Sequence, residues 1–552
     1  MSQPLIECVP NFSEGNDLAV IKQITDAIET VEGVKLLDVD PGKATNRTVV
    51  TFVGPPEPVL EAAVRAVRQA KELIDMRKHH GAHPRFGACD VCPLVPVADI
   101  TMEQTVEWAR KLGHRLAAET GISGYYYEYA ATRPERKNLA TVRAGEYEGL
   151  PEKLRHPDWK VDFGTGEFDP KYGVTAVGAR DFLVAYNVNL NTTSTRRANA
   201  VAFDIREKGR PDPAGGDRWI PGSLKCVKAI GWFIKEYGIA QISINLTNLN
   251  VTPVHVAFDE CKKKAEERGL RVTGSELVGL IPLSAMLAAG KHYLRLQQRS
   301  LGIPDHEIVK IAVKSLGLSD LKPFKPEEKI IEYAIAAGRK QPRLVDMTVE
   351  GFVWETASES KAPGGGSVSA AMGAMGAALG TMVANLSSHK RGWDHRWEEF
   401  SNWAEKGKAA HDELLRLIDE DTNAFNRIVA AWNLPDASPD EKTAKNAAIQ
   451  AATKDAIRVP LRAMEVALAA MDVCRAMAEI GNPASVSDAG VGALACRSAV
   501  LGAFLNVKIN ASGVEDKAWL AEVLTRGARI QEQAVALERQ ILDLVNQKIV
   551  TA

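Results

Sequence analysis

The sequence has little of several features that define other protein classes. Only seven cysteines occur in 552 residues, and this sparse, odd set does not suit a disulfide framework, so we expect reduced thiols in a cytoplasmic protein. Neither sign of charge dominates, since 68 Lys and Arg face 70 Asp and Glu, which argues against a broad nucleic-acid surface. Residues 1–11 lack a basic segment followed by an apolar one, so we expect no secretory signal.

Runs of large aliphatic residues are also scarce. Residues 367–386 carry no charge and have the length of a membrane-spanning helix. However, they are mostly Ala, Gly, Ser and Met, which gives little drive for insertion. We therefore predict a tightly packed helix of a bundle and no membrane span.

What is present is the composition of a soluble globular protein in several domains. The chain is 45 % hydrophobic and 25 % charged. Its first part alternates short β-like runs with amphipathic helices, and a similar order recurs further on, which predicts two α+β subdomains at 1–180 and 181–330, each a sheet with helices on one face. The predicted strands are 5–9, 35–39, 48–53, 91–97, 124–129, 182–190, 224–234, 240–248 and 271–277. The predicted helices are 18–30, 59–74, 102–119, 197–207, 255–268 and 284–298.

The pattern changes after about residue 336. The small, basic segment 336–342 suits a connection, and we place a linker at 331–346. Strand signals are almost absent from 347–552, which we predict to be an all-α helical bundle. Its predicted helices are 348–359, 367–388, 394–432, 439–470, 489–506 and 515–549.

Three polar loops of the first half carry more special residues than connectors need. They cover 8–15, 38–48 and 77–87. In the second, Asp38 and Asp40 share a face at a strand end, and Arg47 opens the next strand and could neutralise one of them. From the residues alone, a capped turn, a surface hairpin with a salt bridge and a basic surface loop are the competing interpretations.

The third loop holds His79, His80 and His83 among cationic side chains. Histidine is the usual general base near neutral pH, and neighbouring positive charge favours its neutral form. Zinc is the alternative, because Cys89 and Cys92 follow in CxxC spacing. Against zinc, Cys92 begins an apolar strand, no second pair follows, and the nearby cations oppose metal binding.

Three glycine-rich stretches could bring backbone amides close to a ligand. Those at 162–173 and 221–225 match neither GxxxxGK[ST] nor GxGxxG in the required context, so we reject a nucleotide. The third, 362–367, precedes the small-residue helix. Amides at a helix start form an anion site, and the alternative is a simple N-cap at Ser367.

An acidic run, 419–421, lies within a continuous helical pattern. Asp419 and Asn423 are four apart and share a face, whereas Asp421 points elsewhere. A solvated surface is the usual use of such a run.

These motifs together resemble a known family. ECVPNFSEG, LLDVDPGKATNRTV, HHGAHPRFGACDVCPLVPV, RAGEYEGLPEK and DFGTGEFDPKYG resemble glutamate formimidoyltransferase, and the resemblance covers about 3–330. APGGGSV, LIDEDTNAF, GNPASVSDA and GAFLNVKIN resemble formimidoyltetrahydrofolate cyclodeaminase. The resemblance implies a bifunctional transferase and ammonia lyase of histidine degradation and one-carbon metabolism. An enzyme of this kind transfers the formimino group of N-formimino-L-glutamate to N5 of tetrahydrofolate. It then forms 5,10-methenyl-tetrahydrofolate and ammonia.

The resemblance also implies site residues. His83 matches the catalytic histidine, and Asp421 matches the cyclodeaminase half, where we expect it to act as acid and base. We further infer that Asp40 holds or protonates the amidine nitrogens and that Arg47 orients a carboxylate as a bidentate fork. The folate-binding positions that we predict are Gly164, Thr165, Gly166, Glu167, Phe168, Tyr172, Gly173, Gly222, Lys225, Gly231, Gly364, Gly365, Gly366 and Ser367.

The implied co-substrate is polyglutamylated tetrahydrofolate, with no metal and no nucleotide, and the implied partner is the chain itself in a ring-like homo-oligomer. Two alternatives stay open. One is a folate-binding or scaffolding module that has lost its chemistry. The other is an enzyme that prefers a formyl donor, which the sequence does not distinguish from a formimino donor.

Overall fold

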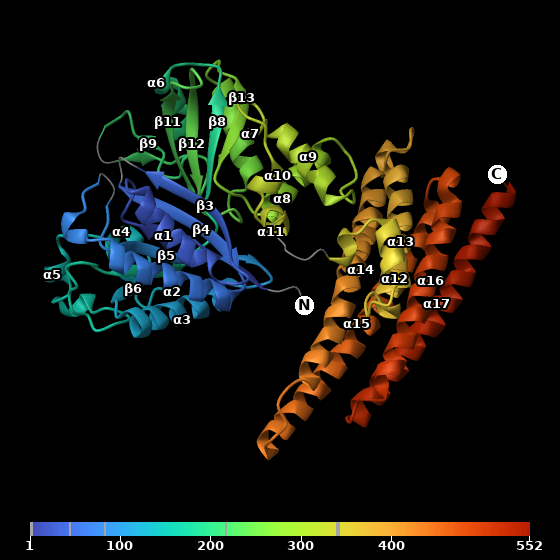
Figure 1. The fold of residues 1–552 in the computed structure, drawn as a ribbon. Helices are drawn as coiled ribbons and strands as arrows, with labels where there is room; N and C mark the ends of the chain where they lie inside the picture. Colours follow the sequence, from blue (N-terminus) through green and yellow to red (C-terminus); the bar gives the residue numbers. More distant parts are fainter. Residues whose placement is uncertain (1–3, 43–45, 82–83, 216–217, 338–342, 552) are drawn as a thin grey trace. The chain divides into compact units, whose positions relative to one another are not determined.

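The computed structural model describes residues 4–42, 46–81, 84–215, 218–337 and 343–551. The chain divides into two compact units (Figure 1). Unit 1 comprises Met1–Ala289 and Val313–Arg339, and unit 2 comprises Gly290–Ala312 and Lys340–Ala552.

Unit 1 begins with a mixed sheet of seven strands. The strand order is β1-β4-β2-β5-β7-β6, and β3 pairs with β4 at the edge. β1 and β2 both lie between β4 and β5, and the break between them falls at Pro10, which has no N–H to donate. The strands are β1 (Leu5–Cys8), β2 (Asn11–Phe12), β3 (Lys35–Gly42), β4 (Arg47–Gly54), β5 (Cys89–Ala98), β6 (Gly124–Glu128) and β7 (Thr175–Ala179).

Both faces of this sheet are covered. Helices α1 (Leu18–Glu29), α2 (Pro56–Leu73) and α3 (Met102–Thr120) bury one face, and short helices α4 (Leu139–Val142) and α5 (Leu150–Lys153) pack on the other. A strand covered on both sides buries every side chain. Consequently Tyr125, Tyr126 and Tyr127 are all buried, although they alternate between the faces.

The second part of unit 1 is a four-stranded antiparallel sheet in the order β11-β12-β8-β13. Helices α6 and α7 pack against it. A two-residue pair, β9 (Arg210–Pro211) and β10 (Trp219–Ile220), stands apart. The bounds are β8 (Val184–Leu190), α6 (Thr195–Ile205), β11 (Val227–Ile234), β12 (Ile239–Leu246), α7 (Val254–Glu266), β13 (Val272–Val278), α10 (Pro326–Lys329) and α11 (Ile331–Ala337). Helix α8 (Leu283–Leu296) begins in unit 1 and ends in unit 2, and most of α9 (Asp305–Ser315) belongs to unit 2.

Unit 2 is a bundle of long helices that run side by side (Figure 1). Its central helix α13 packs closely on α16, because Gly376 faces the backbone of Gly492 where a side chain would collide. Residues 290–312 belong to the same unit, and Leu301 N–H donates to Ser401 Oγ of α14 at 3.0 Å. The helices are α12 (Val349–Ala357), α13 (Gly365–Ser388), α14 (Trp397–Trp432), α15 (Pro439–Ile480), α16 (Val486–Ala511) and α17 (Lys517–Thr551).

The predicted fold class is confirmed: two α+β subdomains precede a helical bundle. The sequence did not predict β7 or α9, and it ended α15 ten residues early. α13 and Pro483–Ala511 have the length and mean hydropathy of membrane spans, but 61 % and 50 % of their most apolar windows are buried inside the structure. Their apolar character therefore serves helix packing at least in part. The exact domain boundaries stay a prediction.

Candidate functional site

Asn46 joins the three polar loops of the first half. Its side-chain Oδ1 accepts from Gly15 N–H at 3.0 Å and from Asn16 Nδ2 at 2.8 Å, and its Nδ2 donates to His80 O at 2.9 Å. Its backbone carbonyl accepts from His79 Nε2 at 2.7 Å. Asn46 adopts a φ of 47°, a left-handed conformation that asparagine tolerates better than most residues. Loops far apart in sequence are therefore held as one surface.

His79 is a structural residue of this surface. Arg85 Nε donates to its Nδ1 at 3.3 Å. Since the guanidinium cannot accept, Nε2 carries the proton that goes to the Asn46 carbonyl. Burial lowers the pKa of His79, and the hydrogen bond to Asn46 only partly opposes this. His80 is exposed, and His83, the predicted catalytic histidine, lies outside the described residues.

Arg47 and Arg143 share one buried carboxylate, Asp90 of β5. Arg143 Nη2 lies 2.7 Å from Asp90 Oδ2, and Arg47 Nη1 lies 3.6 Å from the same oxygen. Arg47 Nε and Nη2 also donate to Asn11 Oδ1, at 3.0 and 2.6 Å. The carboxylate beside Arg47 is thus Asp90, not the expected neighbour in the 38–40 segment, because Asp38 and Asp40 point outward from β3 and are exposed. The roles predicted for Asp40 and Arg47 stay predictions.

These arginines line a cleft of about 770 Å³ between the two subdomains of unit 1. Such a volume suits a folate-sized ligand. Five cationic side chains and two acidic ones line it, so it favours an anionic ligand. The cations are Arg47, Lys137, Arg143, Arg180 and Lys228, and the acids are Glu128 and Asp181.

The predicted glycines of unit 1 have structural reasons to be glycine. A Cβ on Gly164 would lie 2.5 Å from Ile122 O, one on Gly222 would lie 2.0 Å from Arg206 O, and one on Gly231 would lie 2.2 Å from Asn199 N. A Cβ on Gly173 would lie 2.2 Å from Phe86 O. Close packing therefore explains these residues without a ligand, and their predicted folate contacts remain predictions.

The other predicted residues of these stretches differ in exposure. Tyr172 is fully buried, and its hydroxyl exchanges a hydrogen bond with Thr175 Oγ1 at 2.6 Å. Its side chain therefore serves the core and offers no surface to folate. Thr165 and Lys225 are exposed, and Gly166, Glu167 and Phe168 are exposed or half-buried.

Glu7 of β1 is a buried acid, only 3 % exposed. Burial raises its pKa to about 7, and Arg180 opposes the rise. Because this pKa exceeds the ordinary 4.5, protonation of Glu7 favours folding, and that contribution is lost as the pH rises from about 4.5 through 7.

Glu7→Gln is therefore expected to flatten the pH dependence of stability. Between pH 6 and pH 8 the wild-type protein should lose about 1 kcal/mol through this carboxyl, and the variant should not. Thermal unfolding of both proteins at the two pH values measures the difference. Parallel changes in the two midpoints would show that Glu7 does not titrate in this range.

In unit 2, Asp421 of α14 faces the first turn of α13. Ser367 Oγ lies 3.2 Å from Asp421 Oδ2 and donates to Ile418 O at 2.9 Å. A Cβ on Gly366 would stand 2.2 Å from Asp421 Oδ1, so only glycine leaves room for the carboxylate. Burial raises the pKa of Asp421, and hydrogen bonds from Ser367 pull it down. The N-cap of α13 is Gly364, which has no capping side chain, and not Ser367 as the simple-cap alternative supposed.

A cavity of about 150 Å³ opens at Asp421. It is smaller than a site that buries a whole folate. Its lining includes Gly364, Gly365, Asp421, Thr422, Phe425, Asn506 and Asn510.

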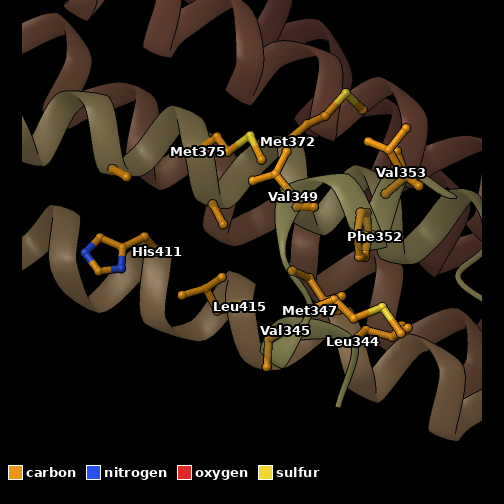
Figure 2. Close-up of a pocket in the computed structure, with 15 residues that line it drawn as sticks. Leu344, Val345, Met347, Val349, Phe352, Val353, Met372, Met375, His411 and Leu415 are labelled. Carbon is orange, nitrogen blue, oxygen red and sulfur yellow. The ribbon is translucent and has the colours of Figure 1, made fainter. Parts of the chain in front are cut away.

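A larger apolar cavity, about 380 Å³, lies between α12, α13 and α14. Figure 2 shows Val349, Phe352 and Val353 of α12 with Met372 and Met375 of α13 around it. Among the lining residues that the structure describes, His411 alone is titratable. Among the described residues, only the smaller of these two cavities has a carboxylate, Asp421, in its lining.

Sequence reasoning missed several of these residues. Asp90 and Arg143 lie inside quoted motifs, and a charged residue within the apolar strand β5 was a usable signal for Asp90. Asn506 and Asn510 also lie inside a quoted motif, GAFLNVKIN, but nothing in the sequence pairs them with Asp421, or Arg180 with the cleft. In the residues that the structure describes, no cluster of three metal-ligating side chains occurs.

Comparison with known proteins covers both units. The family described as the formiminotransferase domain, N-terminal subdomain, matches residues 5–180, the formiminotransferase domain matches 185–336, and formiminotransferase-cyclodeaminase matches 348–529. The formimidoyltransferase-cyclodeaminase of Sus scrofa is 43 % identical over 98 % of this chain and 99 % of its own length.

Two shorter relatives match one unit each. The glutamate formimidoyltransferase of Streptococcus pyogenes serotype M1 is 43 % identical over 53 % of this chain and 94 % of its own. The methenyltetrahydrofolate cyclohydrolase of Methylorubrum extorquens is 36 % identical over 37 % of this chain and 97 % of its own. The fold, the two sites and these matches define an enzyme with two folate-handling halves. The chain belongs to the formimidoyltransferase-cyclodeaminase family.

Proposed function

We propose that the protein catalyses two consecutive steps of folate one-carbon chemistry, one in each unit. Unit 1 transfers the formimino group of N-formimino-L-glutamate to N5 of tetrahydrofolate and releases glutamate. Unit 2 converts 5-formimino-tetrahydrofolate to 5,10-methenyl-tetrahydrofolate and ammonia. The observation that carries the proposal is the half-buried Asp421 carboxylate at a cavity in unit 2, in a chain that resembles a bifunctional relative along nearly its whole length.

The cationic cleft supports the transferase step. Both substrates are anionic, since formiminoglutamate has two carboxylates and folate ends in glutamate. The excess of cationic side chains therefore attracts both. In this proposal His83 takes the N5 proton as N5 attacks the formimino carbon, and Arg47, held by Asn11 and Asp90, keeps a fixed orientation toward a carboxylate.

Asp421 supports the cyclodeaminase step. N10 attacks the formimino carbon of the N5-amidinium, and the carboxylate accepts the N10 proton. The carboxyl returns that proton to the former imino nitrogen, the C–N bond breaks, and ammonia leaves with the positive charge retained on the methenyl product. The raised pKa of Asp421 suits a group that must both accept and return a proton.

Several further properties belong to the proposal. The cations of the cleft suit polyglutamylated tetrahydrofolate, and no step needs a metal or a nucleotide. Apolar side chains exposed on unit 2 support a homo-oligomer, ring-like in the family pattern, because isolated chains rarely expose so many. They include Val349, Val353, Trp354, Leu505 and Ile509. A cytoplasmic location, no membrane span and a place in histidine degradation complete it.

The test is an assay of the purified protein with formiminoglutamate and tetrahydrofolate. We expect glutamate release, ammonia release and the near-ultraviolet absorbance of methenyl-tetrahydrofolate. If glutamate is not released, the transferase step fails for this donor, and a formyl donor or a binding role replaces it. Glutamate release without ammonia would remove the cyclodeaminase step alone.

His83→Ala is expected to lower the rate of formimino transfer by 100-fold or more. Cyclodeaminase activity on supplied 5-formimino-tetrahydrofolate should be unchanged. Glutamate release and methenyl absorbance, measured separately, check this. His80→Ala, in the same loop, is the matched control. Equal loss of both activities in folded His83→Ala would contradict the assignment of one site to each unit.

A further inference from the structure

The cavity at Asp421 has a second polar wall. Asn506 and Asn510 lie one turn apart on α16, and both line the cavity. Residues four apart on a helix share a face, so the two carboxamides face the cavity together, opposite α14 and the start of α13.

The orientation of both carboxamides is fixed by backbone carbonyls. Asn506 Nδ2 donates to Gly502 O at 3.0 Å, and Asn510 Nδ2 donates to Ala456 O at 3.1 Å. A carbonyl only accepts, so the NH₂ group of each asparagine must face it. The two Oδ1 atoms are left as acceptors. No residue that the structure describes donates a hydrogen bond to either of them.

Asn506 and Asp421 approach consecutive glycines from different helices. A Cβ on Gly365 would lie 3.2 Å from Asn506 Nδ2, and a Cβ on Gly366 would lie 2.2 Å from Asp421 Oδ1. The glycine pair therefore lets a carboxylate and a carboxamide reach the same turn of α13. The carboxylate and the amide oxygen that they bring are hydrogen-bond acceptors, and Lys361 and Thr422 line the same cavity as donors.

We propose that Asn506 and Asn510 select the nitrogen of a formimino group over the oxygen of a formyl group. This inference rests on the proposed cyclodeaminase function. The formimino nitrogen carries N–H donors in the amidinium and again in the departing ammonia, and two amide oxygens can accept them. A formyl oxygen has no hydrogen to donate and would face acceptors, which a polar site penalises strongly.

The test compares two ligands of nearly identical shape in the full chain. Asn506→Leu, which removes the acceptor and conserves volume, is expected to lower kcat/KM for 5-formimino-tetrahydrofolate by about 100-fold. The inhibition constant of 5-formyl-tetrahydrofolate should change by less than about threefold or become tighter. Asn510→Leu should act in the same direction. Asn423→Leu, an exposed position on α14, is the matched control and should change neither value.

Asn506→Asp provides a check that does not depend on packing. It keeps acceptor oxygens, so discrimination against 5-formyl-tetrahydrofolate should persist. The second carboxyl near Asp421 should move the acid limb of the pH–rate profile to higher pH.

The inference is overturned if Asn506→Leu and Asn510→Leu weaken both ligands equally, or weaken neither, while the wild type turns over 5-formimino-tetrahydrofolate. It is also overturned if Asn506→Asp leaves the pH profile where it was. A wild type that releases no ammonia from this substrate overturns the proposed function itself, which separates the two failures.

Discussion

Replacing Asp421 by Asn is expected to lower the cyclodeaminase kcat by a factor of about 100 to 10,000, the usual contribution of a positioned acid or base. The amide keeps the shape of the carboxyl against Gly366 but cannot take the N10 proton. Transfer of the formimino group in unit 1 should be unchanged. Ammonia release from supplied 5-formimino-tetrahydrofolate and glutamate release from formiminoglutamate measure the two activities.

The same substitution should not destabilise the protein. Burial raises the pKa of Asp421, so the charged form is less stable in the folded state than in the unfolded state, and its cost grows as the pH rises above the unfolded pKa. Asn removes that cost. The midpoint of thermal unfolding at pH 7 should therefore equal or exceed that of the wild type.

Asp419→Asn is the control for this prediction. Asp419 lies two residues away on α14, and its Oδ1 accepts from Leu344 N–H at 2.7 Å, a bond that Asn can also accept. Cyclodeaminase activity should therefore survive. An Asp421→Asn variant with more than a tenth of wild-type activity would contradict the acid–base role.

Replacing Arg47 by Lys is expected to lower the transferase kcat/KM by about 100-fold or more. The guanidinium donates twice to Asn11 Oδ1 and faces Asp90 with its third nitrogen. A lysine ammonium is a single point charge and cannot keep these contacts in one plane. The negative charge of Asp90, which is fully buried, would then be neutralised mainly by Arg143.

The loss should be confined to unit 1. Cyclodeaminase activity on supplied 5-formimino-tetrahydrofolate should be unchanged, and thermal unfolding should show some loss of stability because a buried carboxylate loses part of its neutralisation. Arg65→Lys, whose partners Glu61 and Thr30 lie on a partly exposed surface, is the matched control. Retention of transferase activity within threefold in Arg47→Lys would show that its fork is not needed.

Much of the fold follows from local pattern. Period-two runs predicted β4, β8, β11 and β12, and helical spacing predicted α2 and α3 within a few residues. β7 was missed because its sequence, TAVGA, is short and small, and it becomes a strand by pairing in parallel between β5 and β6. α15 runs to Ile480 because packing in the bundle supports its last turns.

The candidate sites divide in a similar way. The loops and glycine-rich stretches were visible, since Gly, Pro, Asn and His cluster where regular elements end. The roles of the individual residues in these segments were not visible. Tyr172 is a core residue, and His79 is tied to Asn46 and Arg85, because the partners that decide these roles come from distant segments.

By itself the sequence determined the class of each half, the resemblance to a two-part folate enzyme, and the segments that carry His83 and Asp421. These follow from motifs and periodicity, which are local properties of the chain. Only the tertiary structure decided that Asp90 joins Arg47 to Arg143, that Asn46 holds three loops together, and that Asn506 and Asn510 face the cavity at Asp421. Hydrogen bonds and burial act between atoms that folding brings together. Large sequence separations, such as the 85 residues from Asp421 to Asn506, hide them from any local pattern.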